Sequence, residues 1–216
     1  MTGSPERKDL IVLAADKSME SALRGVLSRT RSLGIRNLTA DIFRHPGQDC
    51  GCRAEGAALL DSQRGQYRHA LLVFDYEGCG VTRQDAAALE GEIEGALQRL
   101  WGENASVVVV DPELEAWVWN TSFHVPDVLG WQDCHPDVLT WLASKGFHIS
   151  DGKPERPKEA VQAVLREVRR PLSSAMYQRL AERVSLERCT DRAFRKLKAV
   201  LQKWFAADGG HPDKEK

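Results

Sequence analysis

Four short apolar runs, separated by amphipathic segments, dominate the first half of the chain. The runs cover residues 10–15, 37–43, 69–74 and 106–110. Most are continuous, as in strands buried on both faces of a parallel sheet, whereas the second alternates. Apolar residues recur at helical spacing over residues 17–33, 53–63 and 83–100. This order predicts an α/β fold with a mainly parallel sheet flanked by helices.

The second half of the chain is predicted to be helical. Helical spacing covers residues 113–120, 136–145, 157–169, 173–186 and 191–205. Turn-forming residues predict a loop at 45–51 and a linker at 151–157. Ser173 and either Thr190 or Asp191 are the expected N-caps. We therefore expect an α/β domain over residues 8–120, a helical extension packed on it over 121–206, and a flexible tail over 207–216.

Composition agrees with a globular protein. Of the 216 residues, 42% are hydrophobic and 28% are charged. No apolar run approaches the roughly 18 residues of a membrane span, and the N-terminus lacks the apolar core of a signal peptide. We expect a cytoplasmic protein with no membrane partner. The five cysteines are irregularly spaced; Cys50 and Cys52 with His45 could form half a zinc site, but free thiols are the favoured interpretation.

The small net charge hides an asymmetry along the chain. The protein carries a net charge of −1, yet residues 1–152 carry −8 and residues 153–203 carry +8. Acidic groups can hold cations and basic groups can hold phosphates, which would give the two parts separate roles. Alternatively, the two parts neutralise each other by packing.

Acidic residues follow the predicted strands directly. Asp16, Asp75 and Asp111 each come immediately after an apolar run. Because the carboxyl ends of parallel strands meet at one edge of a sheet, we expect these side chains to lie together. More acids follow within a few residues, namely Glu20, Glu77, Glu113 and Glu115. Crowded carboxylates need a neutralising cation, and their hard oxygens favour Mg²⁺ or Mn²⁺.

Each acid also has a purely structural interpretation. Asp16 and Asp111 could cap the helices that follow, and Glu113 could complement a helix dipole. Asp75 and Glu77 could belong to an ordinary turn, although in an extended segment they point to the same side. Seven acids at one edge exceed what capping requires. The sequence contains no P-loop, dinucleotide fingerprint or Gly-x-Ser-x-Gly motif.

These motifs resemble a known family. A first strand with an acid just beyond it, and a later strand ending in Asp-x-Glu, are similar to the pattern of Toprim-like domains. The segment D-P-E-L-E-A-W at residues 111–117 resembles the Pro-x-x-Glu-x-Trp motif of small Toprim-like proteins of bacterial defence loci. Over about residues 9–205 the chain is similar to the family of the fourth component of the methylation-associated phage-defence system.

The resemblance implies a Toprim-like sheet and Mg²⁺-dependent processing of nucleic-acid phosphodiesters in antiviral defence. It implies catalytic roles for six acids, which are Asp16, Glu20, Asp75, Glu77, Glu113 and Glu115. Either Glu20 or Asp16 would be the general acid or base, while Glu20, Asp75 and Glu77 would bind the metal. The chain has Asp16-Lys17 where the family has Glu-Gly, and Glu77 where an Asp is usual.

The basic segment is the expected contact for DNA or RNA. We expect phosphate contacts from four residues, which are Arg156, Lys158, Arg169 and Arg170. The alternative is that this segment pairs with acids of the first half such as Glu90, Glu92 and Glu94. Other subunits of a defence system are expected partners, and the alternative function is a non-catalytic scaffold or sensor subunit that binds protein partners or nucleic acid.

Overall fold

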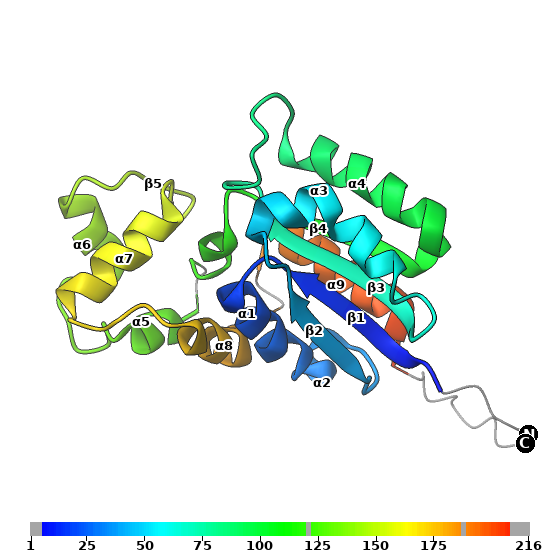
Figure 1. The fold of residues 1–216 in the computed structure, drawn as a ribbon. Coiled ribbons are helices and arrows are strands. Elements are labelled where there is room, and N and C mark those ends of the chain that lie inside the picture. The colour runs from blue at the N-terminus through cyan, green and yellow to red at the C-terminus, as the bar shows by residue number, and fades with distance from the viewer. Residues whose placement is uncertain (1–5, 120–121, 187–188, 208–216) are drawn as a thin grey trace, which may run out of the picture.

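The central sheet has four parallel strands. The computed structural model describes residues 6–119, 122–186 and 189–207. The strands are β1 (Lys8–Ala14), β2 (Ala40–Arg44), β3 (Tyr67–Asp75) and β4 (Ala105–Val110). They are arranged in the order β2-β1-β3-β4, and every pairing is parallel. The predicted α/β fold is confirmed, and the sheet is consistent with a Toprim-like architecture (Figure 1).

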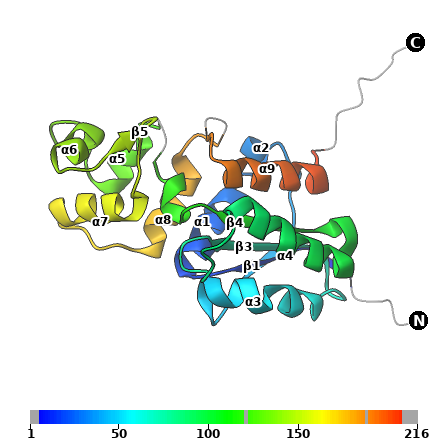
Figure 2. The same cartoon turned by 90° about the horizontal axis from the view of Figure 1, so that it is seen from above.

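Helices cover both faces of this sheet. On one face lie α1 (Lys17–Leu27), α2 (Thr30–Leu33) and α9 (Arg192–Phe205). On the other lie α3 (Gln48–Asp61) and α4 (Ala86–Trp101), followed by the 3-10 turn η1 (Gly102–Asn104). Figure 2 shows α9 and α3 on opposite sides of the sheet. Alternate strand residues such as Val12 and Leu13 therefore enter two separate hydrophobic cores.

The remaining elements form a helical lobe beyond the carboxyl ends of the strands (Figure 1). They are η2 (Leu114–Trp117), α5 (His124–Leu129), α6 (Val138–Ser144), β5 (Ile149–Ser150), β6 (Lys153–Pro154), α7 (Pro157–Glu167) and α8 (Ser174–Arg183). Strands β5 and β6 form a short antiparallel hairpin. None of the helices within the described ranges is both long and apolar enough to cross a membrane.

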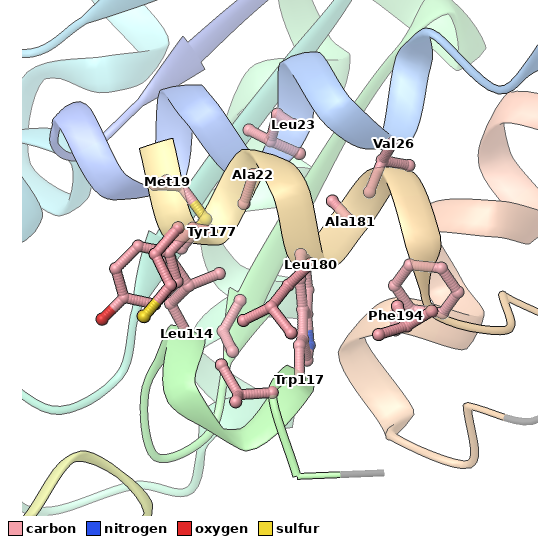
Figure 3. Close-up of a cluster of buried hydrophobic side chains, with 14 of the residues drawn as sticks. Met19, Ala22, Leu23, Val26, Leu114, Trp117, Tyr177, Leu180, Ala181 and Phe194 are labelled. Atoms are coloured by element: carbon pink, nitrogen blue, oxygen red, sulfur yellow. The ribbon is translucent and has the colours of Figure 1, made fainter. Parts of the chain in front are cut away.

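Helix α8 docks the lobe on α1. Figure 3 shows Ala22 and Val26 of α1 facing Leu180 and Ala181 of α8. The two helices approach so closely that a Cβ on Gly25 would lie 2.6 Å from the carbonyl oxygen of Gln178. This packing continues the hydrophobic core of one sheet face into the lobe.

Several predicted boundaries were wrong. The single helix predicted at 17–33 is divided into α1 and α2, and the helix predicted at 113–120 is only the turn η2, which follows a cis peptide bond before Pro112. Helix α5 and the β5–β6 hairpin were not predicted. Asp191 is the N-cap of α9 through its bond to Phe194 N, whereas Ser173 precedes α8 without a side-chain capping bond. Apart from residue 207, the predicted tail lies outside the described residues.

The predicted loop at residues 45–51 contains the first turn of α3. Gly47 lies in a turn as predicted, whereas Gly51 lies within α3 and, like Gly56 further along the helix, serves close packing. A Cβ on Gly51 would lie 2.2 Å from the ring of His45, and one on Gly56 would lie 2.9 Å from Leu72. Tertiary contacts therefore outweigh the low helix propensity of this segment.

Side chains of α4 accept hydrogen bonds from the backbone N–H groups at the open edge of β4. The backbone N–H groups of Val107 and Val109 point away from β3, and they donate to Glu94 (3.1 Å) and Glu90 (2.8 Å) of α4. An unpaired edge would otherwise expose a template for strand addition. Helix α4 therefore both covers one sheet face and closes this edge.

Helix α9 is fixed to the same carboxylates. Arg192 donates to Glu90 (2.8 Å) and to the carbonyl oxygen of Val109 (2.9 Å). Lys196 pairs with both Glu90 (3.0 Å) and Glu94 (2.9 Å). Part of the basic segment thus neutralises the acidic half, as the alternative interpretation held for Glu90 and Glu94.

We predict that Glu90→Ala lowers the free energy of unfolding by about 2 kcal/mol, because it removes charge-assisted hydrogen bonds and leaves the buried N–H of Val109 unpaired. Urea denaturation measures the change. Glu92→Ala on the exposed face of α4 is the matched control and should change stability by less than about 0.5 kcal/mol. Equal effects of the two substitutions would contradict the role of Glu90 at this edge.

We also predict that Gly25→Ala destabilises the protein by about 1–3 kcal/mol, because the new methyl group would force α8 away from α1. Gly95→Ala is the control on α4, where a Cβ would meet no atom within 4 Å. There the higher helix propensity of alanine should stabilise the protein by up to about 1 kcal/mol. Thermal unfolding of both variants checks the expected opposite signs.

Candidate functional site

The topology of the sheet places a crevice between β1 and β3. The chain leaves the carboxyl end of β1 toward α1 on one face and that of the neighbouring β3 toward α4 on the other. In open α/β sheets, ligands bind at the carboxyl ends of strands where connections diverge in this way. Asp16 follows β1 and Asp75 ends β3, so both acids lie at this point.

A cleft of about 380 Å³ opens at the crevice. Acidic side chains and one lysine, contributed by five segments of the chain, line it. They are Asp16, Asp49, Asp75, Glu77, Glu113, Glu159 and Lys158. The structure thus brings together four of the six acids predicted from the sequence, and adds Lys158, one of the four predicted phosphate contacts.

Asp75 is the most perturbed acid of the cleft. Its Oδ1 atom is buried and has no hydrogen-bond partner among the described residues. Burial raises the pKa of this carboxyl well above its usual value, and the nearby carboxylate of Asp49 raises it further. A hydrogen bond from the backbone of Leu114 lowers the pKa of Asp75, but this effect is smaller than the increase caused by burial and Asp49. Such a group in a cleft is typical of a functional site.

Asp16 and Asp49 lie beside Asp75. Asp16 accepts the N–H of Met19 (2.8 Å), so it caps α1, and it also lines the cleft. Asp49 in the first turn of α3 accepts the backbone N–H of Asp75 (2.8 Å). Burial raises the pKa of Asp49, and the charge of Asp16 adds to this.

Asp49 was missed by the sequence analysis because its segment was predicted as a loop. The available signal was its position shortly after the second strand, which brings it to the same sheet edge as the other acids. Its bond to Asp75 joins residues 26 positions apart, and no local pattern reveals such a contact.

Lys158 supplies the positive charge of the cleft. Its ammonium group lies 2.9 Å from Oε2 of Glu113, a residue that is only 3% exposed. Burial favours a lower pKa for Lys158, but the bond to Glu113 and the charge of Glu115 hold it above its usual value. Burial raises the pKa of Glu113 despite the lysine. Half of the Lys158 side chain remains exposed, so its ammonium can still reach a ligand.

The other predicted acids lie outside the cleft lining. Glu20 pairs with Arg24 (2.7 Å) and Arg44 (3.1 Å) and faces a neighbouring hollow. Glu115 is buried and accepts a hydrogen bond from the hydroxyl of Tyr177. Both carboxylates are therefore bound by other side chains.

Asp111 lines a separate hollow beside Pro112. It does not cap the following turn, because the N-cap of η2 is Glu113. The capping role that the sequence suggested for Asp111 was therefore wrong, whereas the one suggested for Asp16 is confirmed.

The predicted phosphate-binding cations divide into two groups along α7. Arg156 and Lys158 lie at its start, and the guanidinium of Arg156 stacks on Phe147 at 5.3 Å. Arg169 and Arg170 follow its other end, which is about 15 Å away at the rise of an α-helix. Of the four, only Lys158 lines the acidic cleft.

The zinc half-site is not formed. Cys50 is exposed at the cleft, Cys52 is buried in the core, and Nδ1 of His45 accepts the N–H of Gly47. None of the five cysteines forms a disulfide. In the described part of the chain, no group of three or more His, Cys, Asp or Glu side chains is already arranged as a metal site.

No family model, curated protein or solved structure gives a significant match to this chain.

We predict that Asp75→Asn stabilises the metal-free protein at neutral pH. Folding raises the pKa of Asp75, so wild-type stability is lost as the pH rises from the unfolded pKa, about 3.9, through the raised folded pKa. Asparagine cannot ionise, so the advantage of the variant should grow between pH 4 and pH 7. Urea denaturation across this range measures it, with Glu92→Gln as an exposed control. Parallel curves for wild type and Asp75→Asn would contradict the raised pKa.

Proposed function

We propose that the acidic cleft binds Mg²⁺ or Mn²⁺ and that the protein processes nucleic-acid phosphodiesters, as a Toprim-like nuclease component of a bacterial antiviral defence system. The observation that carries the proposal is the buried, unpartnered Oδ1 of Asp75 among other carboxylates at the topological switch point. Resemblance of the sequence to Toprim-like defence proteins supplies the reaction class.

The residues of the cleft fit a divalent cation. Carboxylate oxygens are the hard ligands that Mg²⁺ prefers. Asp75 and Glu77, at the end of β3, would hold the ion, and Asp16 lies beside them just after β1. Asp16 takes the place expected of Glu20, because two arginines already bind Glu20. When bound, the ion would neutralise phosphate charge and lower the pKa of a coordinated water.

The chain itself provides binding and proton transfer. Lys158 presents a cation to a phosphate oxygen, and its bond to Glu113 fixes the position of the ammonium (2.9 Å). Asp16 is exposed at the rim of the cleft, so we assign it the role of proton acceptor from water. Arg156, exposed at the start of α7, extends the cationic surface away from Lys158 and along the path of a polyanion.

A second candidate is a non-catalytic scaffold or sensor subunit of the same defence complex. The observation that favours it is the neutralisation of two predicted catalytic acids by the protein itself. Lys158 pairs with Glu113, and arginines pair with Glu20. In that case the cleft and the lobe would bind protein partners or nucleic acid without cleavage.

Incubation with plasmid, linear DNA and RNA separates these candidates. We predict cleavage with Mg²⁺ or Mn²⁺, none with EDTA, and a loss of about 100-fold or more in Asp75→Asn, since this variant removes the charge of a metal ligand. Glu92→Gln should cleave like wild type. Absence of cleavage by wild type with both metals on all three substrates would reject the nuclease and favour the scaffold.

A further inference from the structure

Asp49 occupies the gap that opens where β1 ends beside β3. The N–H of Tyr76 still donates to Val110 of β4 (2.7 Å), as in a continuing sheet. The preceding N–H, that of Asp75, faces β1, whose last strand residue is Ala14. Oδ1 of Asp49 accepts this N–H at 2.8 Å, in place of a strand carbonyl. A carboxylate from α3 thus terminates the sheet at the switch point.

The second oxygen of Asp49 faces the loop that carries the other acids. A Cβ on Gly78 would lie 3.5 Å from Oδ2 of Asp49, and the φ of Gly78 is +95°. The loop after β3 therefore passes directly over this carboxylate, in a backbone conformation that favours glycine. Both Asp49 and Gly78 line the acidic cleft.

The negative charges around Asp49 favour the binding of a cation. Asp49 is half-buried, and the carboxylates of Asp16 and Asp75 are close enough to interact with it electrostatically. Lys158 also acts on Asp49, but its ammonium is already bound to Glu113. The buried Oδ1 of Asp75, which has no hydrogen-bond partner among the described residues, lines the same cleft and is a second, independent observation that points to a ligand.

We infer that Asp49 belongs to the metal site itself, with Oδ1 fixing the end of β3 and Oδ2 serving as a ligand of the divalent ion. The inference rests on the proposed metal site and adds to it an acid from a different element, α3. It also explains how one carboxylate can position Asp75 and balance the ion's charge together with it.

Binding of Mn²⁺ to the metal-free protein, followed by the electron paramagnetic resonance signal of free Mn²⁺, tests this directly. Asp49→Asn keeps an oxygen that can accept the N–H of Asp75 but loses the charge. We expect its Mn²⁺ affinity to fall by at least about tenfold, with the thermal unfolding temperature in EDTA retained or raised. Glu55→Gln, which removes an exposed charge from the same helix, should bind Mn²⁺ like wild type.

The outcomes are distinguishable. Wild-type affinity in Asp49→Asn would overturn the role of Asp49 and leave the proposed metal site standing. No Mn²⁺ binding by wild type would overturn both. A crystal of the wild-type protein soaked in Mn²⁺ gives an answer that does not depend on folding of the variant. An anomalous peak within about 2.5 Å of Oδ2 of Asp49 supports the inference, and a peak bound by other acids alone contradicts it.

Discussion

Crowded negative charge at the carboxyl edge of the sheet is the constraint on which the rest of this structure depends. Specific ion pairs with residues of the basic segment neutralise part of the negative charge in the first half of the chain. Helix α9 contributes Arg192 and Lys196 to Glu90 and Glu94, and α7 contributes Lys158 to Glu113. None of the ion pairs formed within the described ranges includes Asp16, Asp49, Asp75 or Glu77. These four carboxylates line one cleft, where no cation of the described residues forms an ion pair with them.

This arrangement links the stability of the fold to the proposed function. Burial and mutual repulsion raise the pKa values of Asp49 and Asp75, so the metal-free protein is less stable when both are ionised. Proteins commonly accept such local destabilisation at sites that bind a ligand. The helical lobe contributes as well, because the close contact of Gly25 with α8 docks the lobe whose helix α7 carries Lys158 to the cleft.

Much of the sheet could be predicted from the sequence because its signals are local. The continuous apolar runs identify buried parallel strands, and the acids directly after them necessarily lie at one edge. The ion pairing that keeps Glu20 out of the cleft lining could not be predicted in this way, because it depends on Arg44 from the next strand. Asp49 could not be predicted as a site residue for a related reason. The glycines around it resemble a loop, and only packing against His45 shows why Gly51 lies in a helix.

The most direct test of this account is the thermal unfolding temperature of the metal-free protein as a function of Mg²⁺ concentration at constant ionic strength. An ion that binds only the folded cleft stabilises it in proportion to the logarithm of its concentration above the dissociation constant. We expect the unfolding temperature to rise continuously with Mg²⁺ in the wild-type protein and to stay constant in Asp75→Asn. An unfolding temperature that does not respond to Mg²⁺ in the wild type, or that responds equally in both proteins, would contradict a metal site in the acidic cleft.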